Sequence, residues 1–387
     1  MEWQLDPSVI HLNHGAFGAV PRTVADHQTR IRSEIAANPT RFLARELESR
    51  LDAARFVLAE YVGAAPESIA WLDNATTGVN SVLQTFARRL SPGDEIVVTN
   101  HEYNACRNAI DAMASRTGAV ISEVAIPFPV ERPDQVVEAV RSGITHRTRL
   151  MVLDHITSQS GIVMPVEQLV AEVEGAGIPV LVDGAHGPGM VRLDLDSLGA
   201  SFYVGNCHKW LCAPHGAAFL HVSDAYRGQV EPVVVSHGWN DPRPDRERFR
   251  KLFDWTGTDD PSAALSVPTA IETIGSALPG GWPEVMAANR ALALSGRRVV
   301  LDRLGLEPPV PDEMVGSMAT IVLESTPTET PGIIDPLAGE IFASHRIEVP
   351  VFSFPRGSGR VVRLSAHLYN RIDDYEALAD ALSARLG

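Results

Sequence analysis

The chain has 387 residues, 45% of them apolar, which is enough to form the core of a large domain and a smaller one. Mean hydropathy is near zero and no run of about 18 apolar residues occurs, so we expect no membrane-spanning helix. The net charge of −15 repels phosphate backbones, so nucleic acid is not an expected partner.

Two N-terminal segments, 23–36 and 41–62, have the spacing of apolar residues that is typical of helices. From residue 68 onward, short β-rich runs alternate with helical patterns. The predicted strands are 68–72, 95–99, 120–125, 149–154, 178–182, 202–205 and 217–222. The predicted helices between them are 76–90, 104–116, 133–142 and 166–174. This alternation predicts an α/β fold with a mostly parallel seven-stranded sheet, helices on both faces, and ligands at the carboxyl ends of the strands.

The pattern changes after a Pro- and Arg-rich stretch, 240–250, which we interpret as a surface loop. Two long helices are expected over 262–278 and 283–304. Strands follow near 318–323, 347–353 and 360–365, and a last helix over 373–385. We therefore expect an N-terminal arm of residues 1–20 that packs near the C-terminal part, a large ligand-binding domain of residues 21–260, and a smaller α+β domain of residues 261–387.

Cysteine use and the N-terminal residues indicate the compartment. The three cysteines, Cys106, Cys207 and Cys212, are sparse and odd in number, which does not fit a disulfide framework. The first residues, MEWQLDPSVIHLNHG, lack a basic region followed by an apolar stretch, so we expect no signal peptide. These features favour a reducing, cytoplasmic location.

Lysine is rare, because only Lys209 and Lys251 occur and arginine supplies the other basic side chains. Lys209 follows an apolar strand-like run in YVGNCHKWLCAPHG, residues 203–216. Its apolar and aromatic neighbours favour desolvation, which keeps an amine unprotonated near neutral pH and able to form a Schiff base. For Lys251 we predict no special role.

A carboxylate also stands at a predicted strand end, at Asp183 in LVDGAH, residues 181–186. In a pyridoxal 5'-phosphate (PLP) site, such a group would pair with the pyridine nitrogen and keep the ring an electron sink. Alternatively, Asp183 caps the turn at Gly184. Asp183 and Lys209 are one strand–loop–strand unit apart, so both can reach one cofactor.

Two further motifs follow predicted strands. DNATTGVN, residues 73–80, places small and hydroxyl residues at a helix N-terminus, where free backbone N–H groups suit a phosphate. An ordinary N-cap by Asn74 or Thr76 is the alternative. In HEYNA, residues 101–105, Tyr103 would be able to stack on a flat ring, or it is simply a core or surface tyrosine.

Arg363 lies within an apolar strand-like run in VVRLSAHLYN, residues 361–370. A guanidinium that is buried there needs an anion, and the α-carboxylate of an amino acid fits it with two hydrogen bonds. An internal salt bridge with one of the many acidic residues is the alternative.

In this order, these five motifs resemble the class V aminotransferase and cysteine desulfurase family of fold-type-I PLP enzymes, over nearly the whole chain. HLNHGAFGAVP at 11–21, GNCHKWLCAPHG at 205–216 and WTGTDDPSA at 255–263 are similar to its isopenicillin N epimerase-like branch, which includes cysteine S-conjugate C–S lyases. The resemblance implies the PLP-dependent transferase fold type I, PLP as the cofactor, an amino-acid substrate, and a homodimer with active sites at the interface.

The family pattern also implies a role for each matching residue. Lys209 would carry PLP as a Schiff base, Asp183 would pair with the pyridine nitrogen, and His186 would hydrogen-bond the phenolate oxygen. Tyr103 would stack on the ring, and Ser158 would lie near its polar edge. The phosphate would be held by Thr76, Thr77, Asn206 and His208, with Thr258 reaching the phosphate in the neighbouring subunit. The substrate would meet Arg363 through its carboxylate, and Asn13 and His14 in the arm.

In this chemistry the substrate amine displaces Lys209, which then removes the Cα proton as a general base. We favour a carbon–sulfur β-lyase, which would release a sulfur leaving group from Cβ and give pyruvate and ammonia. Epimerisation, and decarboxylation coupled to oxidative deamination of a cysteine S-conjugate, remain alternatives. Cysteine desulfurases of the family carry a nucleophilic cysteine in a loop that corresponds to 346–359 here. That loop has no cysteine in this chain, which disfavours sulfur transfer through an enzyme persulfide.

A metal hydrolase is a remote alternative that belongs to a different class. Its conceivable ligands are His101, His155, His186, His208 and His215, but none has the helical i, i+4 spacing with a glutamate of a zinc protease, so we predict no metal. The Arg-rich, Lys-poor composition points to a GC-rich genome and so to specialised metabolism. The resemblance to the isopenicillin N epimerase-like branch implies a place in antibiotic biosynthesis.

Overall fold

The computed structural model describes residues 1–323, 335–354 and 359–386. Its central sheet has seven strands in the order β2-β8-β7-β6-β5-β3-β4. β8 is antiparallel to both neighbours, and the other neighbouring pairs are parallel. The strands are β2 (Ile69–Leu72), β3 (Glu95–Thr99), β4 (Val120–Val124), β5 (Thr148–Asp154), β6 (Val180–Asp183), β7 (Phe202–Asn206) and β8 (Ala218–Val222). This sheet confirms the predicted fold class.

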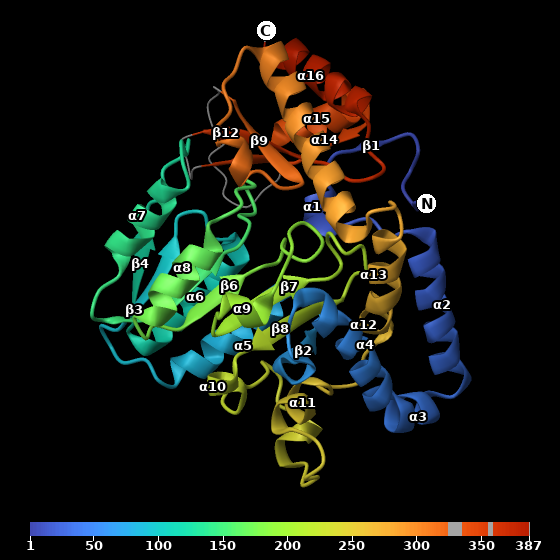
Figure 1. The fold of residues 1–387 in the computed structure, drawn as a ribbon, viewed down its shortest axis with the longest axis vertical. Coiled ribbons are helices and arrows are strands. Elements are labelled where there is room, and N and C mark those ends of the chain that lie inside the picture. The colour runs from blue at the N-terminus through green and yellow to red at the C-terminus, as the bar shows by residue number, and fades with distance from the viewer. Residues whose placement is uncertain (324–334, 355–358, 387) are drawn as a thin grey trace.

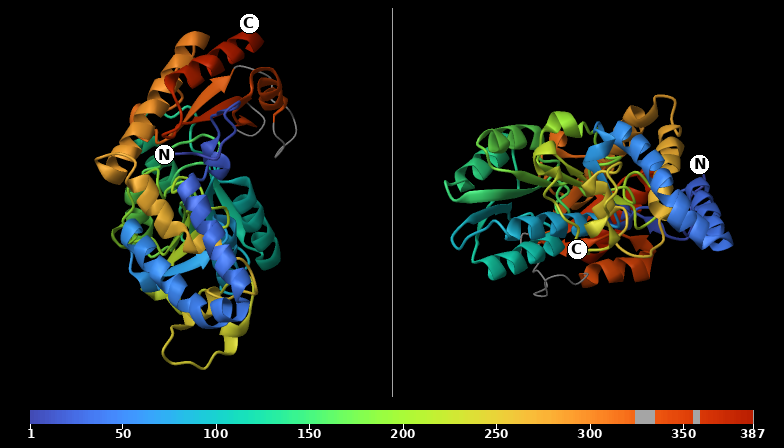
Figure 2. Two further views of the ribbon diagram at one scale, coloured as in Figure 1. Left: turned by 90° about the vertical axis from the view of Figure 1, so that its right-hand side faces the viewer. Right: turned by 90° about the horizontal axis from the view of Figure 1, so that it is seen from below.

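Helices cover both faces of the sheet (Figures 1 and 2). They include α5 (Ala75–Ala87), α6 (Asn104–Thr117), α7 (Asp134–Gly143) and α8 (Val166–Gly175). α5 and α6 share a core with Ile96 and Val98 of β3, whereas α7 and α8 share the core on the opposite face with Val97. Strands buried on both faces read as continuous apolar runs, which is why the sequence identifies them well.

The N-terminal helices lie beside the sheet (Figure 1). The first is α2 (Arg22–Ala37), and the predicted helix 41–62 consists of α3 (Pro39–Arg41), a π-helix (Phe42–Glu46) and α4 (Leu47–Val62). The predicted helix 262–278 is divided into α12 (Ser262–Leu265) and α13 (Val267–Gly275). Pro268 at the start of α13 has no N–H to continue the preceding helix, so a new helix begins there. Both pieces pack on α2 and α4.

The C-terminal part contains a second, antiparallel sheet in the order β11-β12-β9 (Figure 1, top). α14 packs on this sheet and against α16. The predicted strand 347–353 is two strands, because Pro350 lacks the N–H that a continuous strand would use. The elements are α14 (Gly281–Leu304), β9 (Met318–Leu323), α15 (Pro336–His345), β10 (Ile347–Glu348), β11 (Val351–Ser353), β12 (Arg360–Ser365) and α16 (Ile372–Leu386). The domain boundary at residue 261 stays a prediction.

The N-terminal arm lies between the C-terminal part and the loop that follows β7. β1 (Ile10–His11) pairs in parallel with β10, and the Ser365 amide donates to the Leu12 carbonyl. The short helix α1 (His14–Phe17) then ends at Gly18, which has a φ of +78°. A Cβ at Gly18 would lie 2.1 Å from the His208 carbonyl oxygen, so only glycine fits this approach. The arm therefore supports the backbone beside Lys209.

The remaining elements are short. They are the helices α9 (Leu195–Leu198), α10 (Asp224–Arg227) and α11 (Arg248–Phe253), and the 3-10 turns Pro66–Ser68, His237–Asn240 and Asp312–Met314. Among the helices in the described ranges, none combines the length and the apolar character that crossing a membrane requires.

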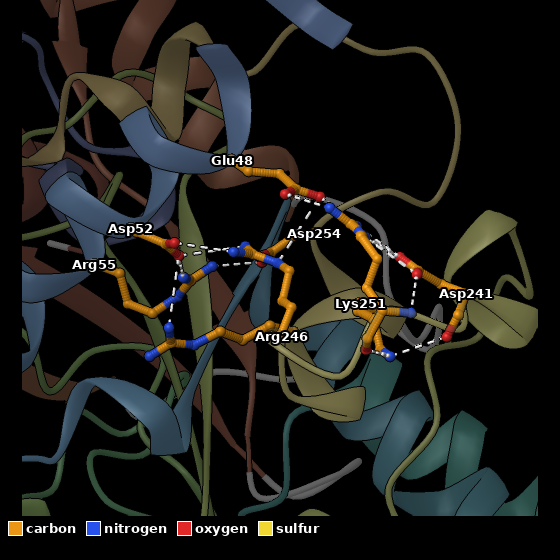
Figure 3. A network of polar contacts seen from close by, with 9 residues as sticks. Glu48, Asp52, Arg55, Asp241, Arg246, Lys251 and Asp254 are labelled. Carbon is orange, nitrogen blue, oxygen red and sulfur yellow. Dashed lines mark hydrogen bonds and ion pairs between the residues drawn. The ribbon is translucent and has the colours of Figure 1, made fainter. Parts of the chain in front are cut away.

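An ion-pair network anchors the predicted loop 240–250 and α11 to α4 (Figure 3). Arg55 is fully buried and pairs with Asp52 and Asp254, and Arg246 bonds the same two carboxylates. Lys251 donates to the Asp241 carbonyl at 2.9 Å and to a second carbonyl of the loop. Lys251 thus has a structural role, which fits the absence of any special prediction for it.

Candidate active site

A cavity of about 170 Å³ opens at the carboxyl ends of the parallel strands. Eight of the residues that the sequence singles out line it: Thr76, Tyr103, Ser158, Asp183, His186, Asn206, His208 and Lys209. They come from five connections that follow five different strands. Seven further residues line the cavity, of which the sequence reasoning names only Asn74, as a helix cap: Ala16, Phe17, Asn74, Ala75, Asp154, Ile156 and Ala185.

Lys209 contributes a half-buried amine to the cavity wall. Its Nζ lies 3.2 Å from Nε2 of His186. Burial, and then the positive charge of Arg363, lower the pKa of Lys209 to about 8. Burial and the charges of Lys209 and Arg363 hold the pKa of His186 well below its usual range, so that ring is neutral. The amine is therefore unprotonated far more often near neutral pH than that of an ordinary lysine.

Asp183 uses its two carboxylate oxygens differently. Oδ1 accepts from the Ala185 amide at 2.9 Å, so the turn-capping role is present. Oδ2 accepts from the Cys106 thiol at 3.2 Å. In the described part of the chain no arginine, lysine or histidine forms an ion pair with this buried carboxylate, which leaves it able to meet a positively charged ring nitrogen.

Two more buried carboxyl groups surround Asp183. Asp154 is its partner in the parallel register of β5 and β6, and Glu102 lies near it beside β3. Burial and then the charge of Asp183 raise the pKa of Glu102 to about 8. Burial, followed by Glu102 and Asp183, raises the pKa of Asp154 well above its usual range. Asp183 and these two neighbours are therefore too close together, and too deeply buried, for all three to stay charged near neutral pH.

The N-terminus of α5 faces the cavity. Asn74 caps the helix by accepting from the Thr77 amide at 2.9 Å, so the N-cap reading is correct. Asn206 accepts from the Ala75 amide at 2.9 Å. No described protein group accepts from the Thr76 amide between them, so this N–H and the helix dipole stay available to an anion.

His208 also lines the cavity, and its ring is neutral with the proton on Nδ1. Its Nδ1 donates to the Ala217 carbonyl at 2.9 Å, and burial lowers its pKa to about 4, with Lys209 as a smaller cause. The neutral ring therefore has a lone pair on Nε2. A phosphate placed at that nitrogen would favour the protonated ring.

Arg363 lies on β12 with only 2% of its surface exposed. It donates to the Ser158 carbonyl, and its Nη2 lies 3.4 Å from Asn13 Oδ1. Its Nε has no partner in the described residues, and it forms no ion pair with a described carboxylate, so the internal salt bridge is not found there. Burial lowers the pKa of Arg363 to about 10. A buried guanidinium with a free N–H is suited to binding a carboxylate.

Several predicted residues do not line the cavity, and Arg363, which contacts it through the Ser158 carbonyl, is one of them. Thr77 turns its hydroxyl to Asn74 at 3.1 Å. Thr258 is exposed, in an irregular segment after α11. His14 lies buried behind the Lys209 loop, with Nε2 3.1 Å from the Lys209 carbonyl, and its ring stacks on His367. Asn13 reaches the site only through Arg363.

The histidines of the metal-hydrolase alternative have different partners. His101 bonds Ser160 at 2.7 Å, and His155 bonds Tyr203 at 2.9 Å. The other three have separate contacts, His186 with Trp210 and Lys209, His208 with the Ala217 carbonyl, and His215 with the Phe17 carbonyl. These contacts give no support to a shared metal centre.

A mostly parallel sheet with a desolvated lysine, a buried aspartate and a helix N-terminus at one cavity defines a PLP-dependent enzyme of fold type I. The family model for aminotransferase class-V matches residues 10–277, and the chain belongs to this family. It is 36% identical over 389 residues to isopenicillin N epimerase of Amycolatopsis lactamdurans, covering 98% of this chain and 95% of that protein. It is 30% identical over 402 residues to a probable chloroplastic L-cysteine desulfhydrase of Arabidopsis thaliana, covering 98% and 83%.

Solved structures share the fold. They include C-DES with glycine covalently linked to its PLP cofactor, and the complex of the cystine C–S lyase C-DES with its product cysteine persulfide. Each gives a TM-score of 0.82 at 20% identity and covers 97% of this chain, with 97% and 98% of the respective neighbour. Pyridoxal 5'-phosphate is the cofactor, as the sequence predicts, and the cavity fits it. The unpaired carboxylate, the Thr76 amide and the Lys209 amine are the groups that this cofactor needs.

Proposed function

We propose that the protein is a carbon–sulfur β-lyase that acts on cysteine or a small cysteine S-conjugate. The observation that carries this proposal is the Lys209 amine, which burial leaves partly unprotonated in the same cavity as Asp183. When bound, PLP withdraws electrons from the Cα of an attached amino acid and so weakens the Cα–H bond. Relatives named cysteine desulfhydrases match over 98% of the chain, which supports sulfur as the leaving group.

We assign each side chain a role in this reaction. Lys209 would attach the cofactor and then remove the Cα proton, and Asp183 would keep the ring nitrogen protonated. His186 would donate to the cofactor's phenolic oxygen, and Tyr103 and Ser158, which line the same cavity, would contact the ring. Thr76, Asn206 and His208, which line the cavity, would hold the phosphate. Thr77, which lies outside the cavity lining, would act only through its hydrogen bonds to the Asn74 cap. Arg363 binds the substrate carboxylate, and Asn13 orients Arg363; His14, which lies outside the cavity, acts through the backbone of Lys209.

The overall reaction consumes one water. The bond from Cβ to sulfur breaks, and the sulfur leaves with the electron pair as a thiol or as sulfide. Water then replaces nitrogen at Cα, which gives pyruvate and ammonia. Each cysteine of the chain is buried, and burial raises the pKa values of the three thiols. An inert thiol does not accept sulfur, so we expect release to solution.

The size of the cavity supports a small substrate. At about 170 Å³ it is well below the roughly 300–1,000 Å³ of pockets for drug-sized ligands. Tyr103 and Phe17 line it and are themselves largely exposed, so a larger substituent on sulfur would extend past them toward solvent.

A second candidate function is epimerisation at Cα. It is supported by 36% identity to an isopenicillin N epimerase and by the phenol of Tyr103, a proton donor in the cavity whose pKa burial raises. Epimerisation needs an acid on the face opposite Lys209, and Tyr103 is the residue that would supply it.

We also propose that the protein functions as a homodimer. Thr258 is exposed and does not line the cavity of its own chain. Large apolar side chains are also exposed nearby in the sequence, namely Val234, Val235 and Trp239. Burying such a patch stabilises association. Sedimentation of the wild type and of Val235→Asp tests this, since a monomeric wild type would contradict it.

The function is tested by mass spectrometry after incubating the PLP-loaded protein with S-methyl-L-cysteine in deuterated water. Pyruvate plus methanethiol supports the lyase. Recovered substrate with deuterium at Cα and partial inversion supports the epimerase and contradicts the lyase. A carbonyl product that has lost carbon dioxide and ammonia, with sulfur retained, indicates oxidative deamination. Lys209→Ala is the control, and it must abolish every one of these changes.

A further inference from the structure

Trp210 is fully buried directly after Lys209, and its indole forms one specific contact with the site. The indole N–H donates to Nδ1 of His186 at 3.2 Å. The other ring nitrogen of His186, Nε2, lies 3.2 Å from the Lys209 amine. A chain of hydrogen bonds therefore runs from Trp210 through one imidazole to the amine that carries the cofactor.

The chemistry of these groups decides where the proton of His186 lies. An indole nitrogen has a proton to give and no lone pair to accept one, so Nδ1 of His186 must be the acceptor. A neutral imidazole carries a single N–H, and burial keeps this ring neutral. The proton must then be on Nε2, where it is directed at Lys209. Lys209 accepts it when its amine is neutral, which is its main form above the pKa of about 8.

We propose that Trp210 is a positioning residue that fixes His186 in the Nε2–H tautomer, so that His186 presents a donor to Lys209 and to the cofactor. This inference rests on the proposed role of His186. Without the indole, the proton is free to move to Nδ1. Nε2 would then present a lone pair, which repels a phenolate oxygen instead of stabilising it.

The proposal is tested with Trp210→Phe in two backgrounds, the wild type and His186→Gln. The first readout is the pH midpoint at which the visible absorbance of the bound cofactor changes, since a donor to the phenolic oxygen shifts that midpoint. We expect Trp210→Phe to raise it by about one pH unit in the wild type, which is the size of one lost hydrogen bond. Glutamine has no tautomers, so the same substitution should shift the midpoint little in the His186→Gln background.

Equal shifts in both backgrounds, or no shift in either, would overturn the proposal, because Trp210 would then act through packing alone. Met318→Leu, in the same small apolar cluster as Trp210, is the control for packing, and it should leave the midpoint unchanged.

A second measurement does not depend on a substitution at Trp210 or on the cofactor. Nitrogen-15 NMR of labelled histidine in the wild-type chain, recorded at about pH 9 so that the Lys209 amine is mostly neutral, should show Nε2 protonated and Nδ1 bare, with His186→Gln to assign the signal. A protonated Nδ1 would refute the proposal. If PLP gives no visible absorbance at all, the proposed function fails, and the NMR result still decides the tautomer.

Discussion

Lys209 is expected to capture PLP from solution with an apparent pKa near 8, and not near the 10.5 of an ordinary lysine. At pH 7 an amine of pKa 8 is unprotonated in about 10% of molecules, against about 0.03% for an ordinary lysine, a roughly 300-fold difference. Only the unprotonated amine attacks a carbonyl, so the capture rate at low PLP should follow this fraction. Between pH 6 and pH 8 the rate should therefore rise about 50-fold.

The assay mixes PLP-free protein with PLP at a series of pH values and follows the visible absorbance. Borohydride reduction and peptide mapping identify the modified residue, and Lys251 is the only other lysine in the chain. Lys251 donates to two backbone carbonyls, so it is expected to react slowly. Lys209→Ala should abolish the fast capture, and Lys251→Ala should leave it unchanged.

Substitutions of Arg363 test what lowers the pKa of Lys209. Burial is the largest cause of the lowered pKa of Lys209 and the charge of Arg363 is the second, so Arg363→Gln should raise the apparent pKa by less than half of the whole shift. Arg363→Lys keeps the charge and is the matched control. An apparent pKa above 9.5 in the wild type would refute the reasoning, because Lys209 would then be no more desolvated than a surface lysine.

Three further outcomes are expected. Gly18→Ala should weaken PLP binding at least tenfold by spectral titration, because its Cβ would lie 2.1 Å from the His208 carbonyl oxygen. Gly93 has a similar positive φ but open space around it, so Gly93→Ala should not weaken PLP binding. Equal effects of the two substitutions would contradict the steric explanation. Asp254→Asn removes an anion bonded to the buried Arg55 and should lower the free energy of unfolding in urea by roughly 3–5 kcal/mol. Glu340 forms an exposed ion pair, so Glu340→Gln should lower the free energy of unfolding by at most about 1 kcal/mol. A similar loss in Asp254→Asn and Glu340→Gln would argue that burial does not set the size of the effect. Arg363→Lys should raise KM for the amino-acid substrate about 100-fold with a smaller effect on kcat, because the ammonium cannot make two parallel hydrogen bonds to a carboxylate; an unchanged KM would remove Arg363 from the substrate site.

Much of the fold could be predicted because its central strands are buried on both faces. The segments 95–99, 318–323 and 360–365 match strands of the structure to the residue. The errors arose where the backbone changes course within an apolar run. Pro268 starts a new helix and Pro350 ends a strand, although the side-chain pattern continues across both. The π-helix at Phe42–Glu46 has no breaker residue to mark it.

The candidate site was predictable to the extent that parallel strands end at one edge. That rule brings Asp183, Lys209, Asn206 and Tyr103 to one cavity. The same rule applies to Asp154, since it ends β5 as Asp183 ends β6, and it would have found this residue. Sequence spacing gives no side-chain direction in irregular segments. For that reason it could not foresee that His14 turns away from the cavity toward His367.

Burial is the common cause of the shifted pKa values in and beside the cavity. The low dielectric that lowers the pKa of Lys209 also raises the pKa values of Glu102 and Asp154. Without the cofactor, the chain buries carboxyl groups that lack positive partners, and such groups oppose folding. A protonated pyridine ring would supply the missing positive charge beside Asp183, and its phosphate would meet the N-terminus of α5. PLP is therefore expected to stabilise the folded chain as well as to supply its chemistry, since a ligand that binds only the native state shifts the folding equilibrium toward it.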